Sequence, residues 1–83
     1  MKLSNHAKIK LEIYGISEGL IINELRLGFR EFYDVREKTF IRMVEVGKIL
    51  LAIVFDNQKE KIITVYRTDR KTIINRQKNK RWL

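Results

Sequence analysis

Two side chains that can exchange protons are the first candidates for chemistry in this sequence. His6 is the only histidine among the 83 residues, and Tyr66 lies near the end of the stretch "KIITVYR" (61–67). A neutral imidazole can accept a proton as a general base, and a phenol can donate one or orient a substrate through a hydrogen bond. We therefore take His6 and Tyr66 as the candidate catalytic residues.

The surroundings of His6 can be predicted from the helix that we expect around it. At 100° per residue, His6 and Lys10 fall between an apolar stripe that contains Leu11 and another that contains Ile9 and Ile13. This pattern predicts His6 at the inward edge of its helix, against a sheet or the mouth of a groove. The positive end of the helix dipole lies close by and favours the neutral imidazole. His6 is then either a proton acceptor or a structural residue bonded to a backbone group or a tyrosine.

The sequence excludes several other kinds of chemistry. It contains no cysteine, which removes disulfides, thiolate zinc sites and thiol nucleophiles. Ser4 and Ser17 are better explained as helix N-caps than as nucleophiles. The acidic residues are spread along the chain without a metal-ligand spacing, and the glycines form no phosphate-binding loop. We therefore expect neither a metal nor a cofactor.

The positive charge is concentrated towards the C-terminal end. The net charge is +8, and residues 67–83 hold seven basic residues and one acid, a net +6. Such an excess favours a polyanionic partner, because each phosphate contact releases counterions. The alternative is a solvated segment that only keeps the protein soluble. The candidate nucleic-acid contacts are Lys10, Arg42, Arg67, Arg70, Lys71, Arg76, Lys78, Lys80, Arg81 and Trp82.

Three of these candidates have structural alternatives or constraints. Arg42 interrupts an otherwise apolar strand, and it could be an edge residue that extends its charge into solvent. Trp82 could stack on a base or dock on its own domain. Arg67 follows Tyr66 in a strand, so the two side chains should point to opposite sheet faces. We therefore pair His6 with Tyr66 and assign Arg67 either to contacts with a phosphate backbone or to the end of the strand.

Local signals divide the chain into two helices followed by strands. Ser4 is a helix N-cap with Gly15 at the other end, and Ser17 caps a second helix that stops at Gly28. The stretch "ILLAIVF" (49–55) is apolar on both faces of the pleat and predicts a central strand covered on both sides. Segments rich in β-branched and aromatic residues predict four strands, at residues 29–35, 39–46, 48–55 and 61–67.

These elements define an α+β fold with a single domain over residues 1–83. A helical hairpin (1–28) packs on one face of a four-stranded, mainly antiparallel sheet (29–67). A basic C-terminal extension (68–83) follows the sheet. No apolar run is long enough to cross a membrane, and the N-terminus lacks a signal-peptide pattern, so we expect a cytoplasmic protein without a membrane partner.

For two parts of this fold the sequence leaves alternative structures open. The C-terminal extension is either a short helix capped by Thr68 or Asp69, or an extended strand followed by a frayed arm. The second helix carries an extra apolar stripe, formed by Leu20 and Leu27, nearly opposite its main stripe. This extra stripe must meet the first helix or a partner subunit, so a homodimer is one possible assembly.

The order of these segments resembles a known family of small proteins, the domain-of-unknown-function 4258 family. Members begin with a His-Ala dipeptide in a helix that closes on a Gly-Ile-Ser step, and they end in a strand similar to Thr-Val-Tyr. The resemblance covers roughly residues 5–67 and leaves the basic extension outside it. The matching residues are His6, Ala7, Gly15, Ile16, Ser17, Thr64, Val65 and Tyr66.

That family is similar to the RelE/ParE-like toxins of toxin–antitoxin pairs. The resemblance implies a small protein that acts on RNA more readily than on DNA and has an antitoxin partner. In the ribonuclease members, the RNA's own 2′-hydroxyl is the nucleophile; here His6 would be the base and Tyr66 the acid or orienting donor. The alternatives are a nucleic-acid-binding module without catalysis, and a structural or interaction domain that forms a homodimer.

Overall fold

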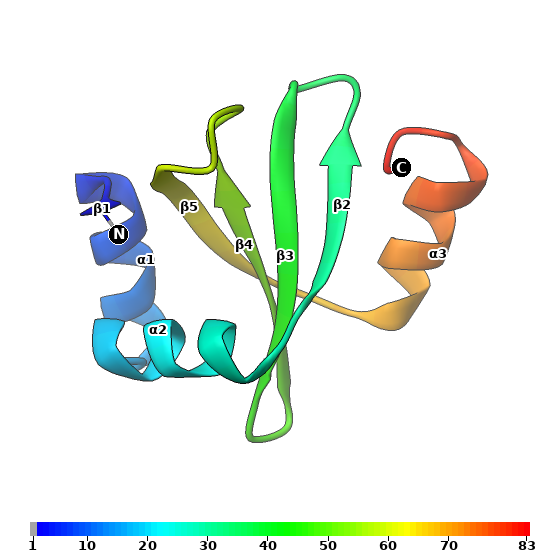
Figure 1. Cartoon of the computed structure of the whole chain (residues 1–83). Helices are drawn as coiled ribbons and strands as arrows, with labels where there is room; N and C mark the ends of the chain where they lie inside the picture. Colours follow the sequence, from blue (N-terminus) through cyan, green and yellow to red (C-terminus); the bar gives the residue numbers. More distant parts are fainter. Residues whose placement is uncertain (1) are drawn as a thin grey trace.

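Two capped helices form the N-terminal layer of the fold. The structure is a computed structural model that describes residues 2–83. Helix α1 (Asn5–Tyr14) begins where the Ser4 hydroxyl accepts a hydrogen bond from the Ala7 N–H at 3.0 Å, and it ends at Gly15 in a left-handed conformation. Helix α2 (Glu18–Leu27) begins in the same way at Ser17. Both predicted N-caps are confirmed, and α1 and α2 lie on the same side of the sheet (Figure 1).

The sheet has five strands in the order β1-β5-β4-β3-β2. Strands β2 (Arg30–Asp34), β3 (Thr39–Val46), β4 (Ile49–Phe55) and β5 (Lys61–Thr68) form the predicted antiparallel meander. The prediction of four strands is wrong by one, because β1 (Lys2–Leu3) adds to β5 in parallel. A two-residue strand has no local pattern; it forms because the Ser4 N–H donates to the Ile62 carbonyl at 2.9 Å, which draws the preceding residues alongside β5.

Both faces of the sheet are covered, as the apolar pattern of β4 indicated. On one face, Leu51, Ile53 and Phe55 pack against α1 and α2. On the other face, Ala52 and Val54 belong to a second buried cluster. The fold is thus α+β with helices on both faces. The expected arrangement, with helices on one face only, lacked the helix that covers the second face.

The C-terminal extension forms this third helix, α3 (Arg70–Lys78). The Asp69 carboxylate accepts a hydrogen bond from the Thr72 N–H at 2.7 Å, so Asp69 rather than Thr68 is the N-cap. Helix α3 lies on the side of the sheet away from α1 (Figure 1). After it, Lys80 takes a left-handed conformation (φ 57°), and the N–H groups of Arg81 and Trp82 donate back to the Arg76 carbonyl. The chain therefore reverses instead of fraying.

The reversed chain docks on the end of β2. The Val35 N–H donates to the Arg81 carbonyl and the Leu83 N–H to the Tyr33 carbonyl, both at 2.9 Å. Trp82 is 2% exposed, and its indole N–H donates to the buried Asp34 carboxylate at 3.1 Å. A backbone pairing and a buried side chain thus hold the C-terminal end of α3 against the sheet.

Replacing Trp82 by alanine should lower the free energy of unfolding by about 3–4 kcal/mol, because it removes a large buried ring and leaves a cavity. Urea denaturation followed by circular dichroism measures this loss. Leu83→Ala is the matched control, since Leu83 is 70% exposed and its truncation should have little effect. Equal losses in the two variants would contradict the docked position of Trp82.

The Asp34 carboxylate should make stability depend on acid pH. Burial raises its pKa, but hydrogen bonds from the Glu37 and Arg36 backbone, the Arg81 side chain and the Trp82 indole outweigh burial and hold the pKa below the ordinary 3.8. A carboxyl with a lowered folded-state pKa stabilises the fold above its ordinary pKa, and this contribution is lost as the pH falls through the lowered value.

Asp34→Asn should therefore be less stable than the wild type at neutral pH and should lose less stability between neutral pH and strong acid. Urea denaturation at a series of pH values measures both differences. Parallel stability curves for the two proteins across the acid range would show that Asp34 does not carry this dependence.

Candidate nucleic-acid interface

The structure does not bring the two candidate catalytic residues together. His6 is exposed, so its predicted place at the inward edge of the helix is wrong. That prediction assumed that both apolar stripes of the helix were buried. Only the stripe with Ala7 and Leu11 packs on the sheet, whereas Ile9 and Ile13 are 55% and 69% exposed. With one buried stripe, His6 lies at the solvent side of α1.

Tyr66 lies on the other face of the sheet. Its neighbour Val65 belongs to the cluster under α1 and α2, so the alternation of the strand turns Tyr66 towards α3, where it packs against the second cluster. Burial raises the pKa of Tyr66, and the nearby Asp34 carboxylate adds to this effect, against the opposing charges of Arg76 and Arg81. The phenol is therefore protonated at neutral pH and can donate a hydrogen bond, but no contact joins it to His6.

Three of the predicted nucleic-acid contacts hold the fold together instead. Trp82 is a core residue that packs on Phe32, with ring centroids 5.5 Å apart, so it is not free to stack on a base. The Arg81 guanidinium pairs with Asp34 at 3.3 Å. These roles follow from the reversed chain after α3, which the sequence pattern did not predict.

Arg42 is likewise engaged within the fold. Its guanidinium pairs with Glu31 at 3.0 Å and stacks between the rings of Phe29 and Phe55, at 4.3 and 4.5 Å from their centroids. Lys59 binds the other oxygen of Glu31 at 3.0 Å. With its side chain 17% exposed, Arg42 is neither a free phosphate contact nor a solvated edge residue.

The remaining predicted contacts separate into two groups on opposite sides of the sheet. Lys10 and Arg67 lie near Tyr14 on the α1 side: the Lys10 ammonium is 5.8 Å from the Tyr14 ring centroid, and the Arg67 N–H donates to the Tyr14 hydroxyl at 3.3 Å. The basic residues of α3 and its following turn belong to the other side. They are Arg70, Lys71, Arg76, Lys78 and Lys80.

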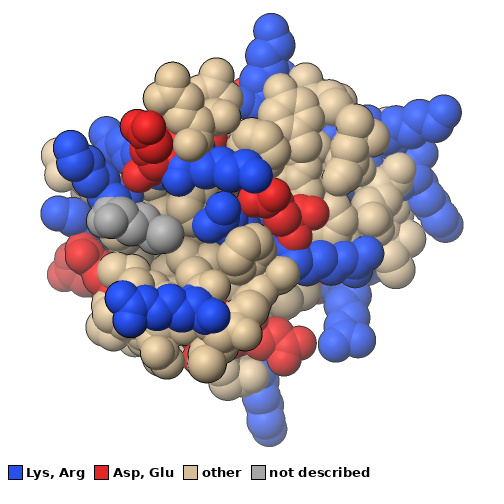
Figure 2. All heavy atoms as spheres, in the orientation of Figure 1, with Lys and Arg blue, Asp and Glu red and all other residues tan. Residues whose placement is uncertain are grey.

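Helix α3 directs its cations to two different flanks. Ile73 faces the sheet and is 7% exposed. At 100° per residue, Arg76 falls on the flank towards Tyr66 and Trp82, and its guanidinium is 6.0 Å from the Trp82 ring centroid. Arg70 falls on the opposite flank, whereas Lys71 and Lys78 fall nearly opposite Ile73, on the outer surface of the helix, and all three are exposed. In Figure 2, Lys and Arg side chains project from the side of the molecule on which Figure 1 shows α3.

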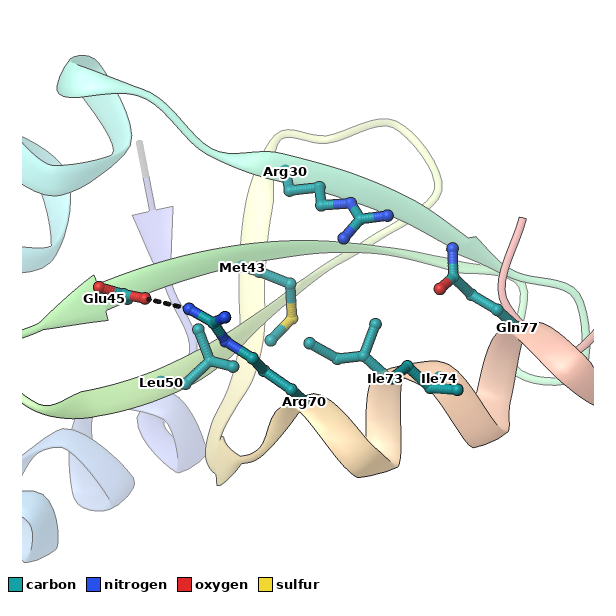
Figure 3. Close-up of a pocket in the computed structure, with 8 residues that line it drawn as sticks. All are labelled: Arg30, Met43, Glu45, Leu50, Arg70, Ile73, Ile74 and Gln77. Atoms are coloured by element: carbon teal, nitrogen blue, oxygen red, sulfur yellow. Dashed lines mark ion pairs between the residues drawn. The ribbon is translucent and has the colours of Figure 1, made fainter.

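An open groove of about 470 Å³ runs along this second flank, between α3 and strands β2 to β4 (Figure 3). Its apolar walls come from the sheet and from α3, and polar side chains line the rim. Arg70 pairs across the rim with Glu45 at 3.6 Å, and both side chains are largely exposed. The lining residues are Arg30, Met43, Glu45, Leu50, Arg70, Ile73, Ile74 and Gln77.

Sequence reasoning named Arg70 among the groove residues and missed the others, which include the hydrogen-bond donors Arg30 and Gln77. Both lie at the same end of the groove in Figure 3. Arg30 shares a sheet face with Phe32, two residues later, and its guanidinium is 5.0 Å from the Phe32 ring centroid. That alternation was visible in the sequence. The missing information was which face α3 covers, since this depends on the docking of the last residues.

We compared the chain with protein-family models, with curated proteins and with solved structures, and none of them matched. Among residues 2–83, no helix is both long enough and apolar enough to cross a membrane.

Proposed function

We propose that the protein binds single-stranded RNA through the outer flank of α3 and the adjoining groove. The observation that carries the proposal is the position of Arg70, Lys71 and Lys78. They project from a helix that is capped at its start and anchored at its end, next to a groove with Arg30 on its rim. Ordered cations lose less conformational freedom on binding than those of a frayed arm, which favours affinity.

The charge of this flank suits a phosphate backbone. Glu45 is the acid on the groove rim, and its pairing with Arg70 joins two largely exposed side chains, so it is weak and can be exchanged for a phosphate contact. Each phosphate that the protein neutralises should lower the slope of log affinity against log salt by about 0.7 for a single strand.

The groove favours RNA with unpaired bases over a duplex. Its apolar walls, formed by Met43, Leu50 and Ile74 among others, can cover the face of a base that has left its stack. The Arg30 and Gln77 side chains on the rim can hydrogen-bond to a base edge. Single-stranded RNA offers such bases, whereas a duplex keeps them stacked and paired.

The same geometry supports binding without cleavage. Cleavage through the 2′-hydroxyl needs a base and an acid on opposite sides of one phosphate. His6 lies on α1 and Tyr66 on the α3 face of the sheet, so they cannot serve one phosphate. A toxin-like role with an antitoxin partner, implied by the family resemblance, stays a prediction in this proposal.

Reversing the two outer lysines, in the variant Lys71→Glu/Lys78→Glu, should weaken binding to a short fluorescent RNA by tenfold or more, because two phosphate contacts become repulsive. Fluorescence anisotropy over a series of salt concentrations measures the affinity and its salt slope. The matched control is Lys2→Glu/Lys61→Glu, which makes the same change of charge at exposed positions on β1 and β5.

The control should retain most of the affinity and the full salt slope. Equal losses in both variants would mean that net charge, rather than the α3 flank, determines binding. Tighter binding to duplex DNA than to RNA of the same sequence would overturn the choice of partner. Degradation of the RNA by the purified protein, abolished in His6→Ala or Tyr66→Phe, would overturn binding without cleavage.

A further inference from the structure

We infer that the outer surface of α1 and α2 is a contact between two copies of this chain. This surface carries four aliphatic side chains that the fold leaves uncovered: Ile9, Ile13, Leu20 and Leu27, at 55%, 69%, 38% and 75% exposure. They lie on the sides of the two helices opposite the buried stripes with Ala7 and Leu11, and with Ile21 and Leu25. The inference does not depend on the proposed RNA binding.

The net charge of the layer formed by α1 and α2 indicates which partner this surface binds. From Asn5 to Leu27, three basic residues are balanced by three acids, so the layer is neutral in a chain of net charge +8. The remainder of the chain holds the whole excess of positive charge. Two copies can therefore approach through this layer while their basic surfaces stay apart, whereas a pairing through the α3 surface brings like charges together.

The polar edge of the α1 stripe is complementary to itself. Lys8 and Glu12 are exposed, one turn apart, on the same side of Ile9 and Ile13. An antiparallel pairing of α1 about a two-fold axis brings Lys8 of each copy opposite Glu12 of the other. Lys10, on the other edge, is turned towards its own Tyr14 ring.

The same balance of charge argues against a lipid surface as the occupant. Helices that lie on membranes combine an apolar face with a basic polar face that attracts anionic lipids. The polar residues of α1 and α2 have no net charge, and the excess of positive charge lies in the sheet, its turns and the segment with α3. A second copy is the occupant that this surface fits.

Sedimentation equilibrium from low micromolar to near-millimolar concentration tests the inference. The mass should rise from that of the 10.0 kDa chain towards twice that value, and it should rise further when salt screens the repulsion between two basic proteins. RNA binding has the opposite salt dependence, so failure of one proposal is distinguishable from failure of the other.

Ile9→Lys should stay monomeric over the whole range. Ile74→Lys is the matched control, because Ile74 on α3 is 50% exposed, close to Ile9, and lies outside the layer; it should still dimerise. Circular dichroism verifies the fold of each variant, which should be intact because the replaced side chains are exposed.

A cysteine placed in the contact gives a second readout, since the chain has no other thiol. Ile13→Cys should form a covalent dimer on mild oxidation, and Ile74→Cys should form much less. A monomeric wild type at every concentration and salt, or equal cross-linking of the two cysteine variants, would overturn the inference. So would a monomeric protein that binds lipid vesicles through Ile9 and Ile13.

Discussion

The buried contact between Trp82 and Asp34 is the constraint on which the rest of the structure depends. Asp34 accepts hydrogen bonds from the Trp82 indole and the Arg81 guanidinium, and from the Arg36 and Glu37 backbone in the turn after β2. One carboxylate thus joins the C-terminal end of the chain to a turn of the sheet. Because this contact fixes the end of α3, it also sets the groove and the direction of the cations beside it.

Much of the fold could be predicted because its signals are local. Ser4 and Ser17 cap helices through hydrogen bonds within three residues, and the apolar segments of β2 to β5 are continuous in sequence. The position of β1 could not be predicted, since a parallel pairing with β5 depends on residues about sixty positions apart. The helix α3 was one of two open alternatives, because Ile73 is its one buried residue and it has little amphipathic pattern.

For the candidate site, too, the sequence predicts what depends on local signals and not what depends on contacts between distant residues. The charge of residues 67–83 was enough to select Arg70, Lys71 and Lys78 as candidates, and their contact with a nucleic acid stays a prediction. Burial decides the roles of Trp82, Arg81 and Arg42. Asp34 lies far in sequence from Arg81 and Trp82, and Glu31 meets Arg42 only through the register of β2 and β3. His6 was misplaced because the two apolar stripes of α1 look alike in sequence, although the sheet covers only one of them.

The molecule therefore has two unlike surfaces on either side of its sheet. The surface of α1 and α2 is neutral and carries exposed aliphatic side chains, whereas the surface of α3 is basic and borders a groove. A dimer formed through the first surface would present two copies of the second on its outside. Under the proposed function, two such surfaces in one particle would raise the affinity for an RNA long enough to reach both.

Chemical-shift mapping tests the central claim most directly: that RNA binds the α3 flank and the groove. Isotope-labelled protein would be titrated with a short single-stranded RNA while the backbone amide signals are followed. We expect perturbations that cluster at Arg70 to Lys78, Arg30 and Met43, with little change along α1. Perturbations centred on His6 and α1, or none at saturating RNA, would contradict it.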